Sequence, residues 1–275
     1  DTSAVISGKQ ATVQALLQPL TDTRLDDIGY YRFDVGKVAG ARTAGGTTHR
    51  AEVVVSNADA PFTYKHMIDP AHRKKHTDAR VDRMDYSMGL VVAYFGTERK
   101  YDDVKHHTIL LGPRYRGLLD DIFSKKVLAP DFSLYLHRPT ASDPGLAPPG
   151  KDAFYVLSPV PNQESGIDWS EASERYLTNI LTALETTLPD LKANLSTSFF
   201  VDPRYFSGRL RSASGAAFGP APVLSQSAWM RFHNRSDDVG DLYFVGAGTH
   251  PGGGVPGVLS SAKIVDDLIT ETTNP

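Results

Sequence analysis

The chain has 275 residues, of which 40% are hydrophobic and 22% are charged, and its formal net charge is -3. This composition indicates an ordinary soluble globular protein of about one to two domains, without the positive charge that would draw it to nucleic acid. Because the chain has no cysteine, disulfides, iron–sulfur clusters, thiolate zinc sites and cysteine nucleophiles are excluded.

The first 60 residues predict part of an α/β domain. They begin without the basic region and apolar core of a signal peptide, and no apolar run in the chain approaches the roughly 20 residues of a membrane-spanning helix. The unbroken β-branched run at 53–55 predicts a strand buried on both faces, as in a parallel sheet, and a polar turn follows at 56–61. The expected elements are a helix at 11–20, strands at 37–43 and 48–55, and a turn at 44–46.

Residues 61–225 predict a separate α+β body. Its expected strands lie at 88–95, 131–140 and 152–160. A helix is expected at 168–191, with Asp168 and Glu171 as a capping box and Pro189 near its end. One face of this helix carries Tyr176, Leu177, Ile180, Leu181 and Leu184.

Residues 226–275 return to the α/β pattern. A buried strand is expected at 242–248 and a helix at 257–269, with apolar side chains at Val258, Ala262, Val265 and Ile269. The α/β segments at 1–60 and 226–275 therefore bracket the middle body. This order predicts an α/β sheet domain interrupted by an inserted α+β domain.

The loop between the last strand and the last helix is rich in glycine. Strand, glycine loop and helix together offer backbone N–H groups and a partial positive charge to an anion, and glycine lets a ligand approach the backbone closely. The other interpretation is a tight strand–helix crossover that needs a few glycines. The spacing G-x-G-x-x-G of a dinucleotide site fails, because Gly246-Ala247-Gly248 is followed by Thr249-His250-Pro251. The loop glycines are Gly246, Gly248, Gly252, Gly253, Gly254 and Gly257.

Several blocks of sequence carry a family resemblance. GDLYFVGAGTHPGGGVPG at 240–257 resembles the carboxyl-terminal signature of the bacterial-type phytoene desaturases, which are FAD-dependent carotenoid desaturases. The resemblance continues, in the family's order, through AEVVVSNADAPFTYKHM, GPRYRGLLDDIF, DFSLYLHRPTASDPGLAPPG, YVLSPVPN and LSQSAWMRFHNR. The family begins with a Rossmann G-x-G-x-x-G unit that this chain does not contain, so the chain resembles the carboxyl-terminal half of such an enzyme.

The resemblance implies a fold and an activity. The fold would be a partial FAD-binding, Rossmann-like domain of the flavin amine oxidase and carotenoid desaturase type, with an inserted α+β substrate domain. The activity would be desaturation of phytoene toward lycopene with FAD as hydride acceptor, and the isolated chain would be inactive. The residues that the resemblance places against FAD are Gly246, Ala247, Gly248, Thr249, Gly254, Val255, Pro256, Gly257 and Val258.

A C40 polyene implies an apolar tunnel and peripheral contact with the inner face of the cell membrane. Residues 116–128 could form an amphipathic membrane helix or an ordinary surface helix packed on the core. The candidate tunnel residues, each of which could equally be sheet core, are Tyr86, Met88, Leu90, Val92, Tyr94, Tyr135, Phe154 and Tyr155.

Other interpretations stay open. His250 takes part in chemistry or fixes the loop shape, and Asp59 caps the following turn or faces the cofactor. The protein could instead be a flavin-dependent carotenoid isomerase or ketolase, or a polyene-binding remnant without catalysis. No metal site is expected, since HRKKH at 72–76 fits a solvated helix face and the adjacent His106 and His107 should point in different directions.

Overall fold

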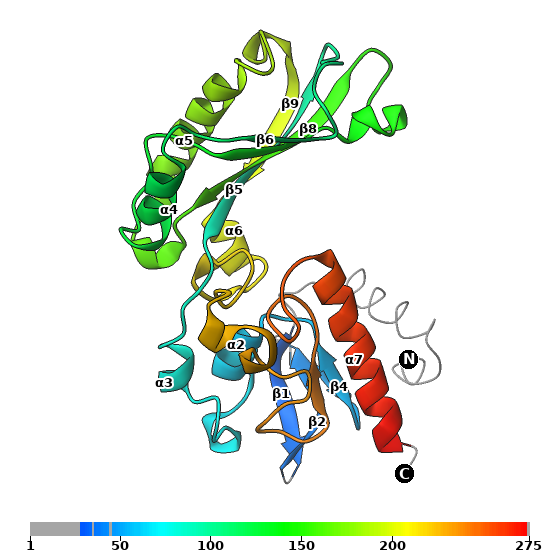
Figure 1. Cartoon of the computed structure of the whole chain (residues 1–275). Coiled ribbons are helices and arrows are strands. Elements are labelled where there is room, and N and C mark those ends of the chain that lie inside the picture. The colour runs from blue at the N-terminus through cyan, green and yellow to red at the C-terminus, as the bar shows by residue number, and fades with distance from the viewer. Residues whose placement is uncertain (1–27, 35, 44–45, 274–275) are drawn as a thin grey trace. The chain divides into compact units, whose positions relative to one another are not determined.

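A computed structural model describes residues 28–34, 36–43 and 46–273, which form two units (Figure 1). The first unit contains the described residues up to Ser87 together with Gly208–Ala213 and Phe218 onward, and the second contains Met88–Ser207 and Ser214–Ala217. These boundaries differ from the expected ones at 60/61 and 225/226, because 61–87, 208–213 and 218–225 join the first unit. It remains a prediction that the first unit binds the cofactor and the second unit binds the substrate.

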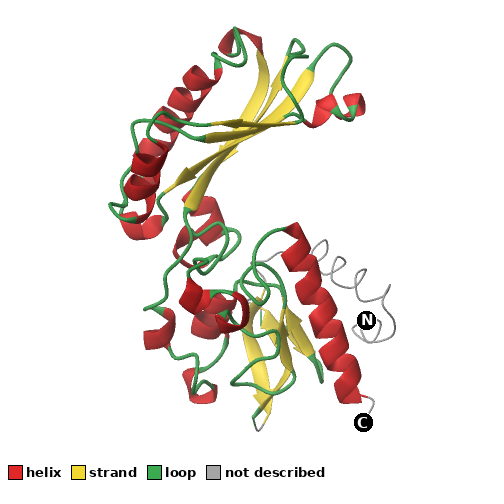
Figure 2. Cartoon of the chain, in the orientation of Figure 1, coloured by secondary structure: helices red, strands yellow, loops and turns green. Residues whose placement is uncertain are grey.

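The first unit has two small sheets (Figure 2). Strands β1, β2 and β3 pair antiparallel in that order, and β4 pairs with β10 in parallel. The bounds of the strands are β1 Ile28–Asp34, β2 Lys37–Thr43, β3 Thr48–Arg50, β4 Val54–Ser56 and β10 Leu242–Phe244. The helices are α2 Ala60–Phe62, a π-helical turn at Thr63–Met67, α3 Asp78–Val81 and α7 Val255–Thr273, with 3₁₀ turns at Pro70–His72, Leu224–Gln226 and Ala228–Met230.

Strand β10 is buried on both faces. Leu242 and Phe244 pack into a cluster with Tyr64 and Phe232, whereas Tyr243 packs with Val265 of α7 on the other side. The parallel pairing predicted from the run at 53–55 is confirmed, although those valines are only half-buried. The single strand expected at 48–55 is wrong, because the chain leaves the antiparallel sheet after Arg50 and enters the parallel one at Val54.

The second unit is a five-stranded antiparallel sheet in the order β6-β7-β8-β5-β9. Helix α5 packs its Tyr176, Ile180 and Leu184 face on one side of the sheet, as expected, and the side chain of Asp168 accepts a hydrogen bond from the Ser170 N–H at the start of the helix. The elements are β5 Gly89–Thr97, β6 His107–Leu110, α4 Tyr115–Phe123, β7 Leu134–His137, β8 Asp152–Val160, α5 Trp169–Leu184, β9 Leu195–Val201 and α6 Pro203–Gly208.

Several sequence expectations differ from these bounds. Strand β8 matches its predicted range, whereas helix α5 ends at Leu184, before the predicted end at residue 191. Strands β1, β6 and β9 were not predicted, and the expected helix at 11–20 lies outside the described residues. None of the described helices is long and apolar enough to cross a membrane.

Candidate functional site

The glycine loop connects the end of β10 to the start of α7, beside the end of β4. A Cβ atom on Gly246 would lie 2.6 Å from the Asn57 side-chain oxygen, and one on Gly257 would lie 2.6 Å from the Gly252 carbonyl oxygen. At these two positions the close packing of the chain against itself requires glycine. The tight-crossover interpretation therefore explains part of the glycine content.

The tip of the loop has a different character. A Cβ atom on Gly253 would meet only Phe218, at 3.9 Å, and one on Gly254 would meet no atom within 4 Å. Gly254 has a φ of +94°, which disfavours other residues whatever the surroundings. Helix α7 begins directly after it at Val255, whose side chain is 75% exposed. The tip thus presents open backbone at the amino-terminal end of a helix.

Two buried side chains hold the base of the loop. The Arg231 guanidinium donates to the Ala247 carbonyl oxygen at 2.7 and 3.1 Å and to the carbonyl oxygens of Phe218 and Pro220 at 2.9 Å each. Asn234 donates to the carbonyl oxygens of Phe244 and His250, at 3.1 and 2.9 Å. Neither residue was identified from the sequence, because a lone arginine and a lone asparagine carry no spacing signal.

The predicted cofactor residues fall into two groups. Gly246 and Thr249 are buried, and the Thr249 hydroxyl donates back to the Gly246 carbonyl oxygen at 3.1 Å. These two build the loop. Ala247 and Gly248, between these two, are half-buried. The second group is accessible: Gly254, Val255 and Pro256 are exposed, and Gly257 and Val258 are half-buried.

Asp59 has the capping role that the sequence left open. Its carboxylate accepts hydrogen bonds from the N–H groups of Phe62, at 3.2 Å, and Ala213, at 3.1 Å. Burial raises the pKa of Asp59 to about 6, although both N–H groups and the charge of Arg231 favour the ionised form. A carboxyl group that caps a helix here therefore holds its proton more tightly in the folded state than in the unfolded chain.

We expect Asp59→Asn to gain stability relative to the unmodified protein as the pH rises from about 4 to about 6. Because the folded-state pKa lies above the ordinary value of 3.8, ionisation of Asp59 destabilises the fold across this window. The amide keeps a carbonyl oxygen as acceptor, so the gain should be about 1–3 kcal/mol. Denaturant unfolding at several pH values measures it.

Asp168→Asn is the matched control. Asp168 is also a capping residue, but the hydrogen bonds from Ser170 lower its pKa. Its ionisation stabilises the fold above its ordinary pKa, so this variant should lose stability relative to the unmodified protein as the pH rises. Equal pH profiles for Asp59→Asn and the unmodified protein would contradict the buried cap.

The second unit carries a row of aromatic rings across its whole sheet. His107, His137, Tyr155, Tyr94 and Phe199 are successive partners on the five strands. Cross-strand partners project from the same face, and this face is opposite to the one that α5 covers. Tyr94 and Phe199 stack with ring centroids 4.7 Å apart, and they are 38% and 62% exposed.

The candidate tunnel residues do not all share this face. Tyr94, Tyr135, Tyr155 and Val92 do, by register, whereas Phe154 is core, stacked on Phe95 beneath α5. Burial and the nearby Tyr135 hydroxyl raise the pKa of Tyr155 to about 12, so its hydroxyl stays protonated. This part of the sheet is therefore a neutral, aromatic surface. Leu90 also lies on this face by register but is buried, whereas Met88 packs beside α4 and Tyr86 belongs to the first unit.

The adjacent His106 and His107 were expected to point apart, and that expectation is wrong. One ring nitrogen of each lies within 4.8 Å of the other and of a ring nitrogen of His137. Strand β6 begins at His107, so His106 precedes it and the side-chain alternation of a strand does not apply to the pair.

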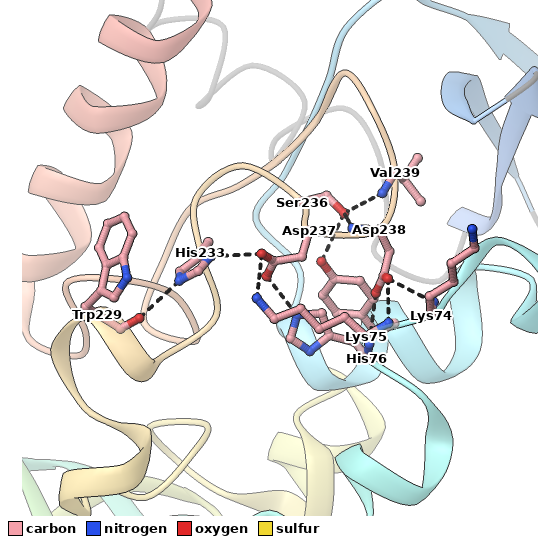
Figure 3. Close-up of polar contacts among 10 residues, drawn as sticks. Lys74, Lys75, His76, Trp229, His233, Ser236, Asp237, Asp238 and Val239 are labelled. Carbon is pink, nitrogen blue, oxygen red and sulfur yellow. Dashed lines mark hydrogen bonds and ion pairs between the residues drawn. The ribbon is translucent and has the colours of Figure 1, made fainter.

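The segment HRKKH is not a solvated helix face. The helical turn ends at His72, Arg73 is extended and residues 74–76 form a bend. The side chain of His76 is buried and contacts Asp237 at 3.0 Å. Asp238 accepts hydrogen bonds from the backbone N–H groups of residues 74, 75 and 76, at 2.7–2.9 Å (Figure 3). Two consecutive carboxylates thus fix this segment.

Asp237 is the centre of that network. It contacts Lys75 at 2.7 Å and His233 at 3.0 Å in addition to His76 (Figure 3). Burial opposes its ionisation, but the hydrogen bonds from these three side chains outweigh burial and lower the pKa to about 2. The network ties the HRKKH segment to the segment that precedes β10.

Comparison with known proteins shows which sequences this chain resembles. No model of a protein family matches it. It is 44% identical over 284 residues to the neurosporene-forming phytoene desaturase of Rhodobacter capsulatus, an alignment that covers 98% of this chain and 54% of the relative. It is also 44% identical over 232 residues to the lycopene-forming phytoene desaturase of a Paracoccus species, covering 84% of this chain and 46% of the relative.

Solved structures show the same fold at low identity. An oxidoreductase from Methanosarcina mazei matches with a TM-score of 0.56 and 20% identity, over 87% of this chain and 48% of that one. A putrescine oxidase variant matches with a TM-score of 0.58 and 13% identity, over 98% of this chain and 54% of that one. The chain thus shares the mixed α/β fold of these oxidoreductases. In sequence it is a homologue of the bacterial phytoene desaturases, and it spans about half the length of the curated relatives that it matches.

Proposed function

We propose that the protein that carries this sequence desaturates phytoene or a related carotenoid precursor, with FAD as hydride acceptor. The similarity to phytoene desaturases over nearly the whole chain carries this proposal. In such a reaction the polyene would lose two hydrogens from neighbouring carbons and gain a C=C bond between them, with FAD as the acceptor of the hydride and solvent as the acceptor of the proton. When bound, FAD supplies the redox chemistry, and the protein supplies binding and orientation.

The loop tip in the first unit fits a flavin cofactor. Open backbone at Gly253 and Gly254 lets a flat ring or a phosphate approach without meeting a Cβ atom. The start of α7 would stabilise negative charge on the bound group by about 0.3–1 kcal/mol. In this proposal 254–258 contact the cofactor, and Gly246 and Thr249 hold the loop in shape.

The aromatic row in the second unit fits a long polyene. A conjugated or partly conjugated chain binds through apolar area and stacking, and it needs an extended surface without charge. The row crosses all five strands, and Tyr94 and Phe199 already expose ring faces. We infer that the second unit is the substrate-binding domain and that the first unit holds part of the FAD site.

Peripheral membrane contact forms part of the proposal, because such a substrate dissolves in lipid. Helix α4 buries Leu118 and Ile122, whereas Phe123 and Val127 remain 47% and 46% exposed. The nearby Lys125 contacts Asp120 and Asp121 at 2.8–2.9 Å. Since this cation is already paired, apolar contact rather than attraction to anionic lipid would hold the protein at the inner face of the cell membrane.

Flavin absorbance tests the proposal. We expect phytoene in detergent, added without oxygen to the FAD-bound protein, to bleach the flavin and to yield a product with a longer conjugated system. Tyr94→Ala should raise KM for phytoene about tenfold, with little change in kcat, because it removes binding area that ground state and transition state share.

Tyr205→Ala is the matched control for the row. Tyr205 is 43% exposed, close to the value for Tyr94, but it lies on α6, so KM should not change. If the flavin stays oxidised and the product differs from phytoene only in cis–trans geometry, the activity is isomerisation and not desaturation. Polyene binding with no product at all would indicate a binding protein without catalysis.

A further inference from the structure

Three imidazoles gather at one edge of the sheet in the second unit. His107 is the first residue of β6, His137 is the last residue of β7, and the two are direct cross-strand partners. His106 immediately precedes β6. One ring nitrogen of each histidine lies within 4.8 Å of the other two. The group draws on two strands, so only the folded sheet brings it together.

The closest pair of these nitrogen atoms is near the spacing that one metal ion requires. Nε2 of His106 and Nε2 of His137 are 2.7 Å apart, which corresponds to one imidazole donating to the other. Two nitrogens bound to one tetrahedral Zn²⁺ at about 2.0–2.1 Å would be separated by about 3.3–3.4 Å. A shift of well under 1 Å, shared between two side chains, converts one arrangement into the other.

Hydroxyl groups already orient two of the rings. Nδ1 of His106 lies 2.5 Å from the Ser142 hydroxyl, and Nδ1 of His107 lies 2.6 Å from the Tyr135 hydroxyl. Each contact uses one ring nitrogen and leaves Nε2 as the nitrogen for a ligand. Metal-binding histidines generally have such a partner on the other nitrogen, because it fixes both tautomer and ring orientation.

The residue types select which metals could bind. Among the described residues the group consists of histidines without a carboxylate. Neutral nitrogen ligands suit Zn²⁺, Co²⁺, Ni²⁺ and Cu²⁺, whereas Mg²⁺ and Ca²⁺ require oxygen ligands.

The geometry points to a binding site for a divalent transition metal of the Zn²⁺ class, with His106, His107 and His137 as ligands and a fourth position open to water. The ion would join the edge strand β6 to β7. Ser142 and Tyr135 are positioning residues, since they act on the metal through the histidines. This inference does not rest on the flavin proposal, and the site shares His107 and His137 with one end of the aromatic row.

Cobalt titration of the metal-free protein tests the site. We expect one equivalent of Co²⁺ to produce a visible absorption band that Zn²⁺ then abolishes. His107→Gln should remove the band, and because His107 is exposed the variant should still fold. Tyr135→Phe should weaken binding about 10- to 100-fold while keeping all three ligands. His49→Gln, an exposed histidine on β3 of the first unit, should bind as the unmodified protein does.

Thermal unfolding provides a second readout. Excess Zn²⁺ should raise the melting temperature of the unmodified protein and of His49→Gln, but not that of His107→Gln, because only a ligand of the folded state stabilises it. The absence of a Co²⁺ band in the unmodified protein would overturn the inference. So would a band that survives in both His107→Gln and His137→Gln at unchanged affinity.

Discussion

Asp152→Ala should lower the free energy of unfolding of the second unit by about 3–5 kcal/mol. The Asp152 carboxylate is fully buried and accepts hydrogen bonds from Arg138 at 2.9 and 3.1 Å, from the Thr140 hydroxyl at 2.8 Å and from the Tyr101 N–H at 2.8 Å. Its removal leaves the Arg138 guanidinium, only 5% exposed, without its buried counter-charge. Removing one partner of a buried ion pair lowers the free energy of unfolding by more than the intact pair contributes to it.

The measurement has to isolate the second unit. Trp169 is buried there, whereas Trp229 is 71% exposed in the first unit, so a Trp229→Phe background lets tryptophan fluorescence follow the second unit alone. Arg138→Met combined with Asp152→Leu should recover most of the lost stability, since it removes both charges. On α7 the pair Lys263–Asp267 is 69% and 50% exposed, and Asp267→Ala should cost at most about 0.5 kcal/mol. If Asp152→Ala lowers the free energy of unfolding by no more than Asp267→Ala does, the buried pair does not stabilise the sheet.

The second large effect is expected at Gly253, and it depends on the proposed function. Gly253→Val should lower FAD affinity about 10- to 100-fold, which corresponds to about 1.4–2.7 kcal/mol. The fold has space for the added side chain, because the nearest atom to a Cβ would be 3.9 Å away. The melting temperature without FAD should therefore stay unchanged, and quenching of flavin fluorescence measures the affinity.

Two other glycines separate ligand effects from backbone effects. Gly254→Val should lower both affinity and stability, because a φ of +94° strains a β-branched residue with or without a ligand. Gly208→Val on α6 also has space for its side chain, with no atom within 4 Å of a Cβ, and it should leave FAD affinity unchanged. If Gly253→Val binds FAD with unaltered affinity, the loop tip is not part of the cofactor site.

Local sequence patterns predicted the regular core well. The run of apolar residues within 152–160 predicted β8 with its correct bounds, and the spacing of Tyr176, Ile180 and Leu184 identified the buried face of α5. The last strand and helix followed from a run of apolar residues and a 3.6-residue repeat. In these segments the burial of one face decides the structure, and each residue's neighbours along the chain are enough to show it.

The sequence failed where contacts come from distant parts of the chain. His76 reads as part of a charged surface run, but Asp237, which is far along the chain, makes it a buried residue. His106 and His107 form a site only when β7 brings His137 beside them. The division of 48–55 into two strands likewise depends on β10, since no local signal marks the point where the chain changes sheets.

The parallel pair of β4 and β10 also constrains the order in which the protein can assemble. During synthesis β4 leaves the ribosome long before residues 242–244 exist, and in between the entire second unit emerges, whose strands find their partners within 88–201. Nascent chains generally fold domain by domain, and pairing across a long loop is slow. The inserted unit should therefore be finished first, while β4, with its row of valines, waits unpaired and open to chaperones or to aggregation.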